Sequence, residues 1–297
     1  MTRRQLLAVL AAAAVSACRR SPAASSEPPA PKQPIDAHAA AILAAIENAR
    51  GFDAVKRGDR VVLKVNTNSG DPYPFSTSPT AITAIAGALV ARGAKVVVGD
   101  RSFWGDADTA GNLEANGIAG AARAAGVEVI AFDDEIDWVE VDARLVPSWR
   151  PPVHLPRLVL EADHLFNLAC AKTHFITGVT LGLKNLLGLV RARDRARPGN
   201  LREHHADRIH HQIADIHRVI TPRLTVVDGF QALVTGGPTR RDGTPTIVDA
   251  GVVLAGSDRV AIDVAAIALL QRHAPRTEAV HATTPEQHPT VLAMRRV

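Results

Sequence analysis

The stretch Arg60-Val-Val-Leu-Lys-Val-Asn66 is a short β-branched run of the kind that forms a buried strand. Ser78-Pro79 then supplies a helix cap and a proline at the first helical position, which predicts a helix that stops at Gly93. Residues 95–99 are a second β-branched run. A strand, a helix and another strand in this order predict one unit of a parallel sheet.

The same alternation continues on both sides of this unit. We expect further helices at residues 37–50, 112–125, 178–190, 201–220 and 258–271, and further strands at residues 127–132, 138–142, 164–168, 224–228 and 251–255. Strands that alternate with helices of about ten or more residues are typical of a mostly parallel sheet with helices on both faces. The sequence therefore predicts an α/β fold in a single domain that spans residues 35–297.

Residues 1–17 have the pattern of an export signal, with paired arginines, an apolar run and small residues at its end. The small residues stop at Cys18, which resembles the lipobox of a bacterial lipoprotein, and Arg3-Arg4 resembles the twin-arginine export signal. Residues 18–34 hold five prolines, so we expect an extended tether. The pattern predicts an exported protein, lipid-anchored through Cys18 at the periplasmic side or outer face of the cell membrane. The alternative is an ordinary signal peptide whose arginines are only positive charge.

The chain has two cysteines, Cys18 and Cys170. Lipidation of Cys18 leaves no pair for an intramolecular disulfide, and an iron–sulfur cluster held by cysteines needs about four thiolates. The sequence therefore excludes a cysteine-ligated iron–sulfur cluster and leaves the cofactor otherwise unknown. The net charge of +4 includes four arginines among the first 20 residues, so the domain is close to neutral and we expect no nucleic-acid partner.

Polar residues come at the ends of several predicted strands, the edge at which parallel sheets bind ligands. These residues are Asn66, Asp100, Lys172, His174 and Asp228. Lys64 lies two residues before Asn66, inside an apolar strand where a buried ammonium needs a partner. On an edge strand, Lys64 would instead extend its amine to water.

Lys184 and Asn185 stand in an otherwise apolar, glycine-rich stretch. An isolated lysine there costs free energy unless its charge meets a partner or a ligand. Clustered lysines with an imidazole suit a carboxylate or phosphate ligand, or a base with a lowered pKa. We therefore predict that Lys172, His174 and Lys184 bind or polarise a small anionic substrate. The alternative is a helix on which Lys184 and Asn185 form one polar face.

Three further residues are candidates for ligand binding. Gly237 lies in a glycine-rich loop whose backbone amides are able to hold an anion, although such loops are also common as plain turns. Asp263 lies inside an apolar helix and needs a partner. Asp258 either joins the same site or only caps that helix.

A histidine-rich helix offers a candidate metal site. His204, Asp207 and His211 are spaced by three and four residues, so they share one helix face. Imidazole and carboxylate ligands suit a divalent metal. The alternative is an exposed helix whose carboxylates pair with nearby arginines.

Several of these stretches form a recognisable combination over residues 60–270. They include Val62-Leu-Lys-Val-Asn66, Lys172-Thr-His174, residues 178–188, residues 211–215, residues 227–229 and residues 255–263. The combination resembles a bacterial and archaeal family called domain of unknown function 362. The resemblance implies an α/β fold and a shared polar site, without a reaction. Some relatives carry a ferredoxin-like cysteine cluster that is absent here. Relatives also look longer at the C-terminus, so we expect a final helix or strand to be missing after Val297.

These observations favour an exported, lipid-anchored enzyme that acts on a small anionic substrate, with a divalent metal as an optional participant. A lipid-tethered binding protein for an anion, metal or cofactor needs the same residues and is the first alternative. The second is an accessory subunit of a membrane redox complex, which twin-arginine export would suit. The expected membrane contact is the lipid anchor, and no feature of the sequence specifies an oligomeric state.

Overall fold

The computed structural model describes residues 36–103, 108–133, 135–201 and 206–297. The predicted signal, Cys18 and the tether lie outside these ranges. Within them, seven strands form the main sheet in the order β3-β2-β1-β6-β8-β9, with β7 paired to β6. These strands are β1 (Arg60–Lys64), β2 (Lys95–Asp100), β3 (Glu128–Ala131), β6 (His164–His174), β7 (Gly178–Thr180), β8 (Leu224–Thr235) and β9 (Thr246–Gly256). β7 and β9 pair antiparallel and the others pair parallel, which confirms the predicted mostly parallel sheet.

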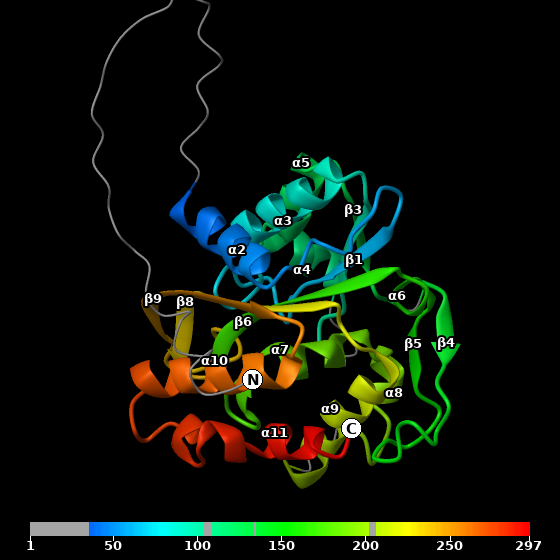
Figure 1. The fold of residues 1–297 in the computed structure, drawn as a ribbon. Coiled ribbons are helices and arrows are strands. Elements are labelled where there is room, and N and C mark those ends of the chain that lie inside the picture. Colours follow the sequence, from blue (N-terminus) through cyan, green and yellow to red (C-terminus); the bar gives the residue numbers. More distant parts are fainter. Residues whose placement is uncertain (1–35, 104–107, 134, 202–205) are drawn as a thin grey trace, which may run out of the picture. The chain divides into compact units, whose positions relative to one another are not determined.

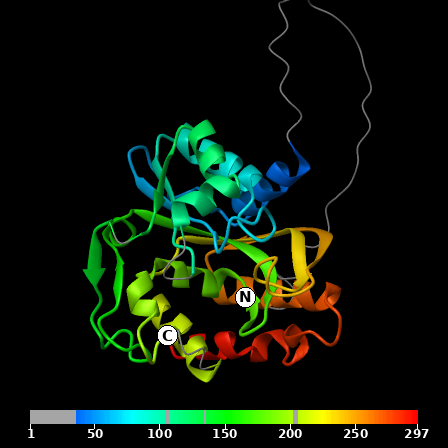
Figure 2. The same cartoon turned by 180° about the vertical axis from the view of Figure 1, so that it is seen from behind.

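Helices cover both faces of this sheet (Figure 1), and the view from behind shows the same layers (Figure 2). One face carries α2 (Ala37–Asn48), α3 (Pro79–Ala91), α4 (Thr109–Ala115) and α5 (Ile118–Ala124). The other carries α7 (Gly182–Asn185), α9 (Ala206–Val219), α10 (Arg259–His273) and α11 (Pro289–Met294). The short elements are α6 (Arg157–Leu160), α8 (Ala192–Arg195), and the separate antiparallel pair β4 (Trp138–Glu140) and β5 (His154–Pro156). The α/β class with helices on both faces is confirmed.

The first strand–helix–strand unit follows from its sequence signals. Ser78 accepts a hydrogen bond from the Ala81 amide at 3.4 Å and begins α3, with Pro79 at the first helical position. The helix buries Ile82 and Ile85 against the sheet, because apolar residues recur on one face at helical spacing. β1 and β2 then lie side by side in parallel register.

The predicted helix over residues 178–190 is wrong. This segment instead forms the strand β7, the single turn α7 and a 3-10 turn at Leu186–Leu189. The predicted helix over residues 112–125 is two helices, because the chain turns at Gly117 with φ of 84°. β6 runs to His174, so Lys172 and His174 lie within an extended strand rather than in a loop after it.

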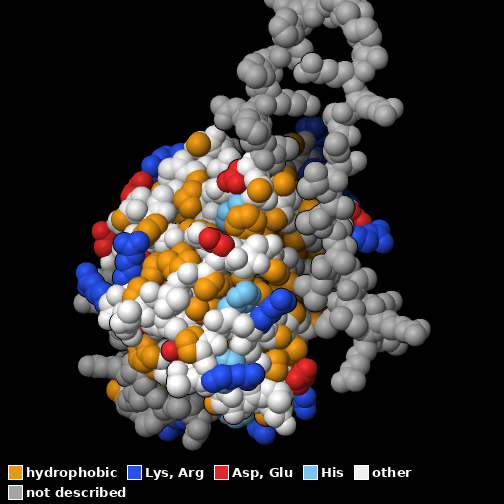
Figure 3. All heavy atoms as spheres, turned by 90° about the vertical axis from the view of Figure 1, so that its left-hand side faces the viewer, with side chains coloured by type: hydrophobic (Ala, Val, Ile, Leu, Met, Phe, Trp, Pro, Cys, Tyr) orange, Lys and Arg blue, Asp and Glu red, His pale blue; other side chains and the backbone are white. Residues whose placement is uncertain are grey.

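At the C-terminal part of the described chain, α11 packs beside α9 and buries Ala293 and Met294. No described helix combines the length and the hydrophobicity that a bilayer crossing needs. On the face that Figure 3 shows, charged side chains of both signs are scattered among apolar ones, without a large area of one sign among the described residues.

Candidate functional site

A cavity of about 40 Å³ lies at the carboxyl ends of β1, β2 and β6. It has room for a small ion or a few water molecules. Of the described side chains that line it, five are cationic and one is a carboxylate. The cationic residues are Lys64, Arg101, Lys172, Lys184 and Arg195, and the carboxylate is Asp100. Asn66 and Asn185 also line the cavity. A space with this excess of positive charge favours an anion.

Lys64 and Asp100 form a buried ion pair in the cavity wall. The Lys64 Nζ lies 2.7 Å from Asp100 Oδ1, and the two side chains are 0% and 3% exposed. The same carboxylate accepts hydrogen bonds from the backbone amides of Thr67 and Arg101, both at 2.7 Å. Burial lowers the pKa of Lys64, and the charge of Asp100 opposes that change. Lys64 is therefore a buried, paired lysine rather than one that extends to water.

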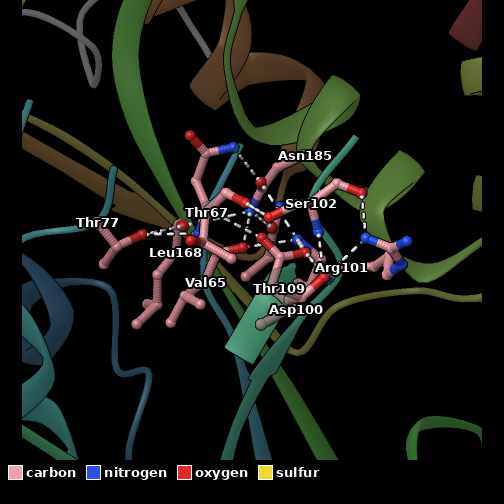
Figure 4. Close-up of polar contacts among 12 residues, drawn as sticks. Val65, Thr67, Thr77, Asp100, Arg101, Ser102, Thr109, Leu168 and Asn185 are labelled. Carbon is pink, nitrogen blue, oxygen red and sulfur yellow. Dashed lines mark hydrogen bonds and ion pairs between the residues drawn. The ribbon is translucent and has the colours of Figure 1, made fainter. Parts of the chain in front are cut away.

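Asn185 ties the segment after β7 to the end of β1 and to the first half of β6 (Figure 4). Its Nδ2 donates to Asn167 Oδ1 at 2.8 Å and to the Leu168 carbonyl at 3.2 Å. Its Oδ1 accepts from Asn66 Nδ2 at 2.9 Å and from Lys64 Nζ at 3.3 Å. These bonds satisfy the buried amide and hold its helical turn over the strand ends.

The turn that carries Lys184 is held on its other side by Asp263 and His217. Asp263 Oδ2 accepts from the Leu183 amide at 3.0 Å, and burial raises the pKa of this carboxyl to about 7. Burial lowers the pKa of His217 to about 4, so its neutral ring donates from Nε2 to the Leu183 carbonyl at 3.0 Å. Asp263 thus lies behind α7 and positions the turn without lining the cavity.

Lys184 differs from the other lysines of the site, because among the described residues its amine has no hydrogen-bond or ion-pair partner. The side chain is partly exposed and lines the cavity, so its exposed part faces that space. Desolvation lowers the pKa of the amine to about 7, and the charges of Lys172 and Arg195 act in the same direction. Near neutral pH, a large fraction of Lys184 is therefore an uncharged amine.

Lys172 and Arg195 supply the like charges beside Lys184. The Lys172 Nζ donates to the backbone carbonyls of Phe75 and, at 3.4 Å, Pro238. Arg195 donates to the Ser102 carbonyl at 3.0 Å, and its guanidinium lies 5.5 Å from the ring centre of Phe103. Burial lowers the pKa of Arg195 to about 9. Burial lowers the pKa of Lys172 as well. Neither basic group pairs with a carboxylate in the described part of the chain, so a bound anion would stabilise the charged form of both.

Three buried polar atoms of the cavity wall have no hydrogen-bond partner among the described residues. They are Asn66 Oδ1, Thr180 Oγ1 and Arg195 Nε. Buried polar groups without a partner are uncommon in folded proteins. Their concentration at one cavity is an independent sign that the site is completed by a bound molecule or by water.

Gly188 allows the chain to pass against the ion pair. A Cβ at this position would lie 2.3 Å from Asp100 Oδ1 and 2.8 Å from Lys64 Nζ. We expect Gly188→Ala to lower the free energy of unfolding by about 1–3 kcal/mol, because the buried pair has to move. Urea denaturation measures this change. Gly87→Ala is the control, since its new Cβ meets no atom within 4 Å in α3, and it is expected to be neutral or slightly stabilising. Equal losses in the two variants would contradict this role of Gly188.

Asp228, predicted for the same site, lies in a separate polar cluster at the end of the first part of β8. Its carboxylate lies 2.9 Å from His38 Nε2 and accepts a hydrogen bond from Tyr73 at 2.8 Å. Burial and the charge of Asp228 raise the pKa of Tyr73, so the phenol keeps its proton. The ring of Phe230 stacks on His38 with 4.5 Å between ring centres. This cluster joins α2, β8 and the segment that follows β1, and it does not line the cavity.

Three other predicted site residues lie outside the cavity lining. His174 ends β6, and its Nδ1 accepts from the Ile176 amide at 3.0 Å. Asp258 caps α10 through bonds from the Val260 and Ala261 amides, at the edge of the sheet opposite the cavity. Gly237 packs on the backbone of β6, where a Cβ would lie 2.2 Å from the Thr173 carbonyl oxygen, and it precedes the cavity-lining Pro238.

Of the candidate metal ligands, His204 and the side chain of Asp207 lie outside the described residues. His211 is a partly buried residue of α9. No group of three or more histidine, cysteine or acidic side chains suited to a metal occurs within the described ranges. The metal site stays a prediction.

Arg101 and Arg195 belong to the site, and sequence reasoning missed both. Arg101 directly follows Asp100 at the end of β2. The rule that parallel sheets bind ligands at the carboxyl ends of their strands (the strand-end rule) would have selected it if extended by one residue. Arg195 lies in the arginine-rich stretch 191–197, where the local sequence does not distinguish this buried guanidinium from the arginines beside it, which are more exposed.

The fold and the site define an α/β domain with a cationic cavity at the strand ends. Residues 61–268 match the family described as Domain of unknown function (DUF362), and the chain belongs to this family. It is 27% identical over 219 residues to a thylakoid-associated protein of Synechocystis sp., a match that covers 73% of this chain and 64% of that relative. Among solved structures, it is similar to the lactate racemase apoprotein of Thermoanaerobacterium thermosaccharolyticum, with a TM-score of 0.45 and 16% identity over 75% of this chain and 52% of that one.

Proposed function

We propose that this protein is an exported, lipid-anchored enzyme whose cationic cavity binds a small substrate with a carboxylate or phosphate group. The observation that carries the proposal is the Lys184 amine, which has no partner among the described residues and lines the cavity together with Lys172 and Arg195. None of these three basic groups pairs with a carboxylate among the described residues, so their charges repel one another, and an anion relieves this repulsion. The small volume restricts the group bound there to a few non-hydrogen atoms.

The catalytic part of the proposal concerns Lys184. An amine with a pKa of about 7 is able to accept and release a proton near neutral pH, as general acid–base catalysis needs. Lys172 and Arg195 would hold the anionic group, while the Lys64–Asp100 pair and Asn185 keep the cavity wall in place. The cellular location rests on the pattern around Cys18, and a relative described as thylakoid-associated is in keeping with a membrane association.

Isothermal titration calorimetry with inorganic phosphate, sulfate and acetate tests the proposed binding. We expect Lys184→Met to weaken anion binding by about ten- to a hundredfold, since a hydrogen bond to a charged group contributes about 1.5–3 kcal/mol. Lys95→Met is the matched control, because Lys95 is exposed at the opposite end of β2. His174→Ala is expected to bind normally if the cavity alone holds the anion. Wild-type protein that binds none of the three anions, or equal affinity in the Lys184 and Lys95 variants, would contradict the proposal.

A further inference from the structure

The cations of the cavity fall into two kinds. Lys64 is committed to Asp100, and Lys172 donates to two backbone carbonyls. Arg195 donates to the Ser102 carbonyl. Lys184 alone among these lysines has an amine that contacts no acceptor in the described residues, while its side chain reaches the cavity. Lys184 is therefore available to react with a ligand, while the basic side chains around it are held by their own acceptors.

This arrangement has a chemical consequence. A lysine is a nucleophile only as the neutral amine, and desolvation beside other cations is a known way to keep it neutral. The charged groups that line the cavity with Lys184 are Lys64 from β1, Asp100 at the end of β2, Arg101 directly after it, Lys172 from β6 and Arg195 from α8. Lys172 and Arg195 favour the neutral amine, and the pKa of about 7 agrees with this geometry.

We propose that Lys184 forms an imine with a small aldehyde or ketone that carries an anionic group. The inference rests on the proposed function, since the anionic group is the one that Lys172 and Arg195 bind. It narrows the substrate class from any small anion to an anionic carbonyl compound. The cavity volume of about 40 Å³ favours a molecule of about two or three carbons, of which glyoxylate is the smallest with both groups.

The proposed step balances without an outside oxidant or reductant. The Lys184 nitrogen attacks the carbonyl carbon, and the C=O π electrons move to oxygen. The nitrogen then loses a proton and the oxygen gains one, which gives a neutral carbinolamine. Loss of the hydroxyl group with one further proton, as water, forms the C=N bond. Asn66 Oδ1 and Thr180 Oγ1 in the cavity wall have no hydrogen-bond partner among the described residues, so they are available to bind the carbinolamine hydroxyl.

Reductive trapping tests the inference on the full-length protein. Glyoxylate with cyanoborohydride converts an imine to a stable secondary amine, and peptide mass spectrometry identifies the modified lysine. We expect close to one adduct per chain, at Lys184, formed at least tenfold faster than on exposed Lys95. Lys184→Arg should remove it and Lys95→Arg should keep it. Acetaldehyde, which has no carboxylate, should react at least tenfold more slowly, and glycolate, which has a carboxylate but no aldehyde or ketone group, should compete.

The pH dependence of trapping is a second test, because it separates Lys184 from an exposed lysine that reacts nonspecifically. Trapping should increase as pH rises through about 7, where Lys184 loses its proton. Lys172→Met removes a like charge, so the pKa of Lys184 and the midpoint should move to higher pH. Labelling spread over exposed lysines, or no adduct at Lys184, overturns the imine. If phosphate and acetate still bind through Lys184 in that case, the proposed anion site stands and only the imine fails.

Discussion

Asp100→Ala is expected to lower the free energy of unfolding by about 3–5 kcal/mol, the usual cost of removing one partner of a buried ion pair. The variant leaves the Lys64 ammonium without its carboxylate in a position that is 0% exposed. It also removes the acceptor of the backbone amides of Thr67 and Arg101, two buried residues. Guanidinium denaturation at pH 7 measures the loss.

Two further variants test whether the loss of stability comes from breaking the buried Lys64–Asp100 pair or only from removing a charge. Glu114→Ala removes one partner of an exposed pair with Arg123, whose side chains are 54% and 60% exposed, and should cost less than about 1 kcal/mol. Adding Lys64→Met to Asp100→Ala removes the stranded ammonium, so it should recover part of the stability lost in the single variant. An Asp100→Ala loss no larger than that of Glu114→Ala would show that the pair is not desolvated in solution.

Local sequence signals were sufficient for the framework of the fold. The β-branched runs at residues 60–66 and 95–99 and the Ser78-Pro79 cap are short-range patterns, and each produced the expected element. The strand-end rule then selected Asn66, Asp100 and Lys172 because parallel strands place their carboxyl ends at one edge. Short-range patterns combined with this rule are therefore enough to locate the strand-end wall of the cavity.

The segment that carries Lys184 was not predictable in the same way. Its leucines at residues 181–189 suggest a helix, but tertiary contacts determine the backbone. Gly182 passes where a Cβ would lie 2.4 Å from Thr225 Cγ2, and Asn185 bonds to β1 and β6. Asp263, which holds the turn through the Leu183 amide, is about 80 residues away in sequence. No window of local sequence contains both partners.

Asp228 shows a different limit of sequence reasoning. It ends a strand segment as predicted, but β8 continues beyond it to Thr235, and its carboxylate is taken by His38 and Tyr73. Tyr73 lies in the chain after β1 and His38 in the first described helix, so neither partner is adjacent in sequence. The strand-end rule identifies an edge of the sheet, and partner side chains decide which part of that edge becomes a cavity.

Lys184→Met is expected to make the protein more stable near neutral pH while removing its proposed chemistry. The folded-state pKa of about 7 lies below the usual 10.5, so between these values the unfolded chain binds more protons at this residue. Wild-type stability should consequently rise as pH increases from about 7 to 10.5, and the cost of charged Lys184 is largest at or below pH 7. We expect a gain of about 2–3 kcal/mol at pH 6.5, less than the full pKa change implies because the side chain is partly exposed.

In a melting experiment this gain corresponds to a Tm increase of about 5–10 °C at pH 6.5, and the difference between variant and wild type should largely disappear by pH 10.5. Lys95→Met, an exposed lysine on the same sheet, should show no such convergence. A Lys184 variant that is less stable than wild type at pH 6.5, or whose Tm difference is the same at both pH values, would contradict the unpaired amine. If replacing Lys184 makes the folded protein more stable, then Lys184 does not serve the stability of the fold. This is the result expected for a charged side chain that is retained to bind a ligand.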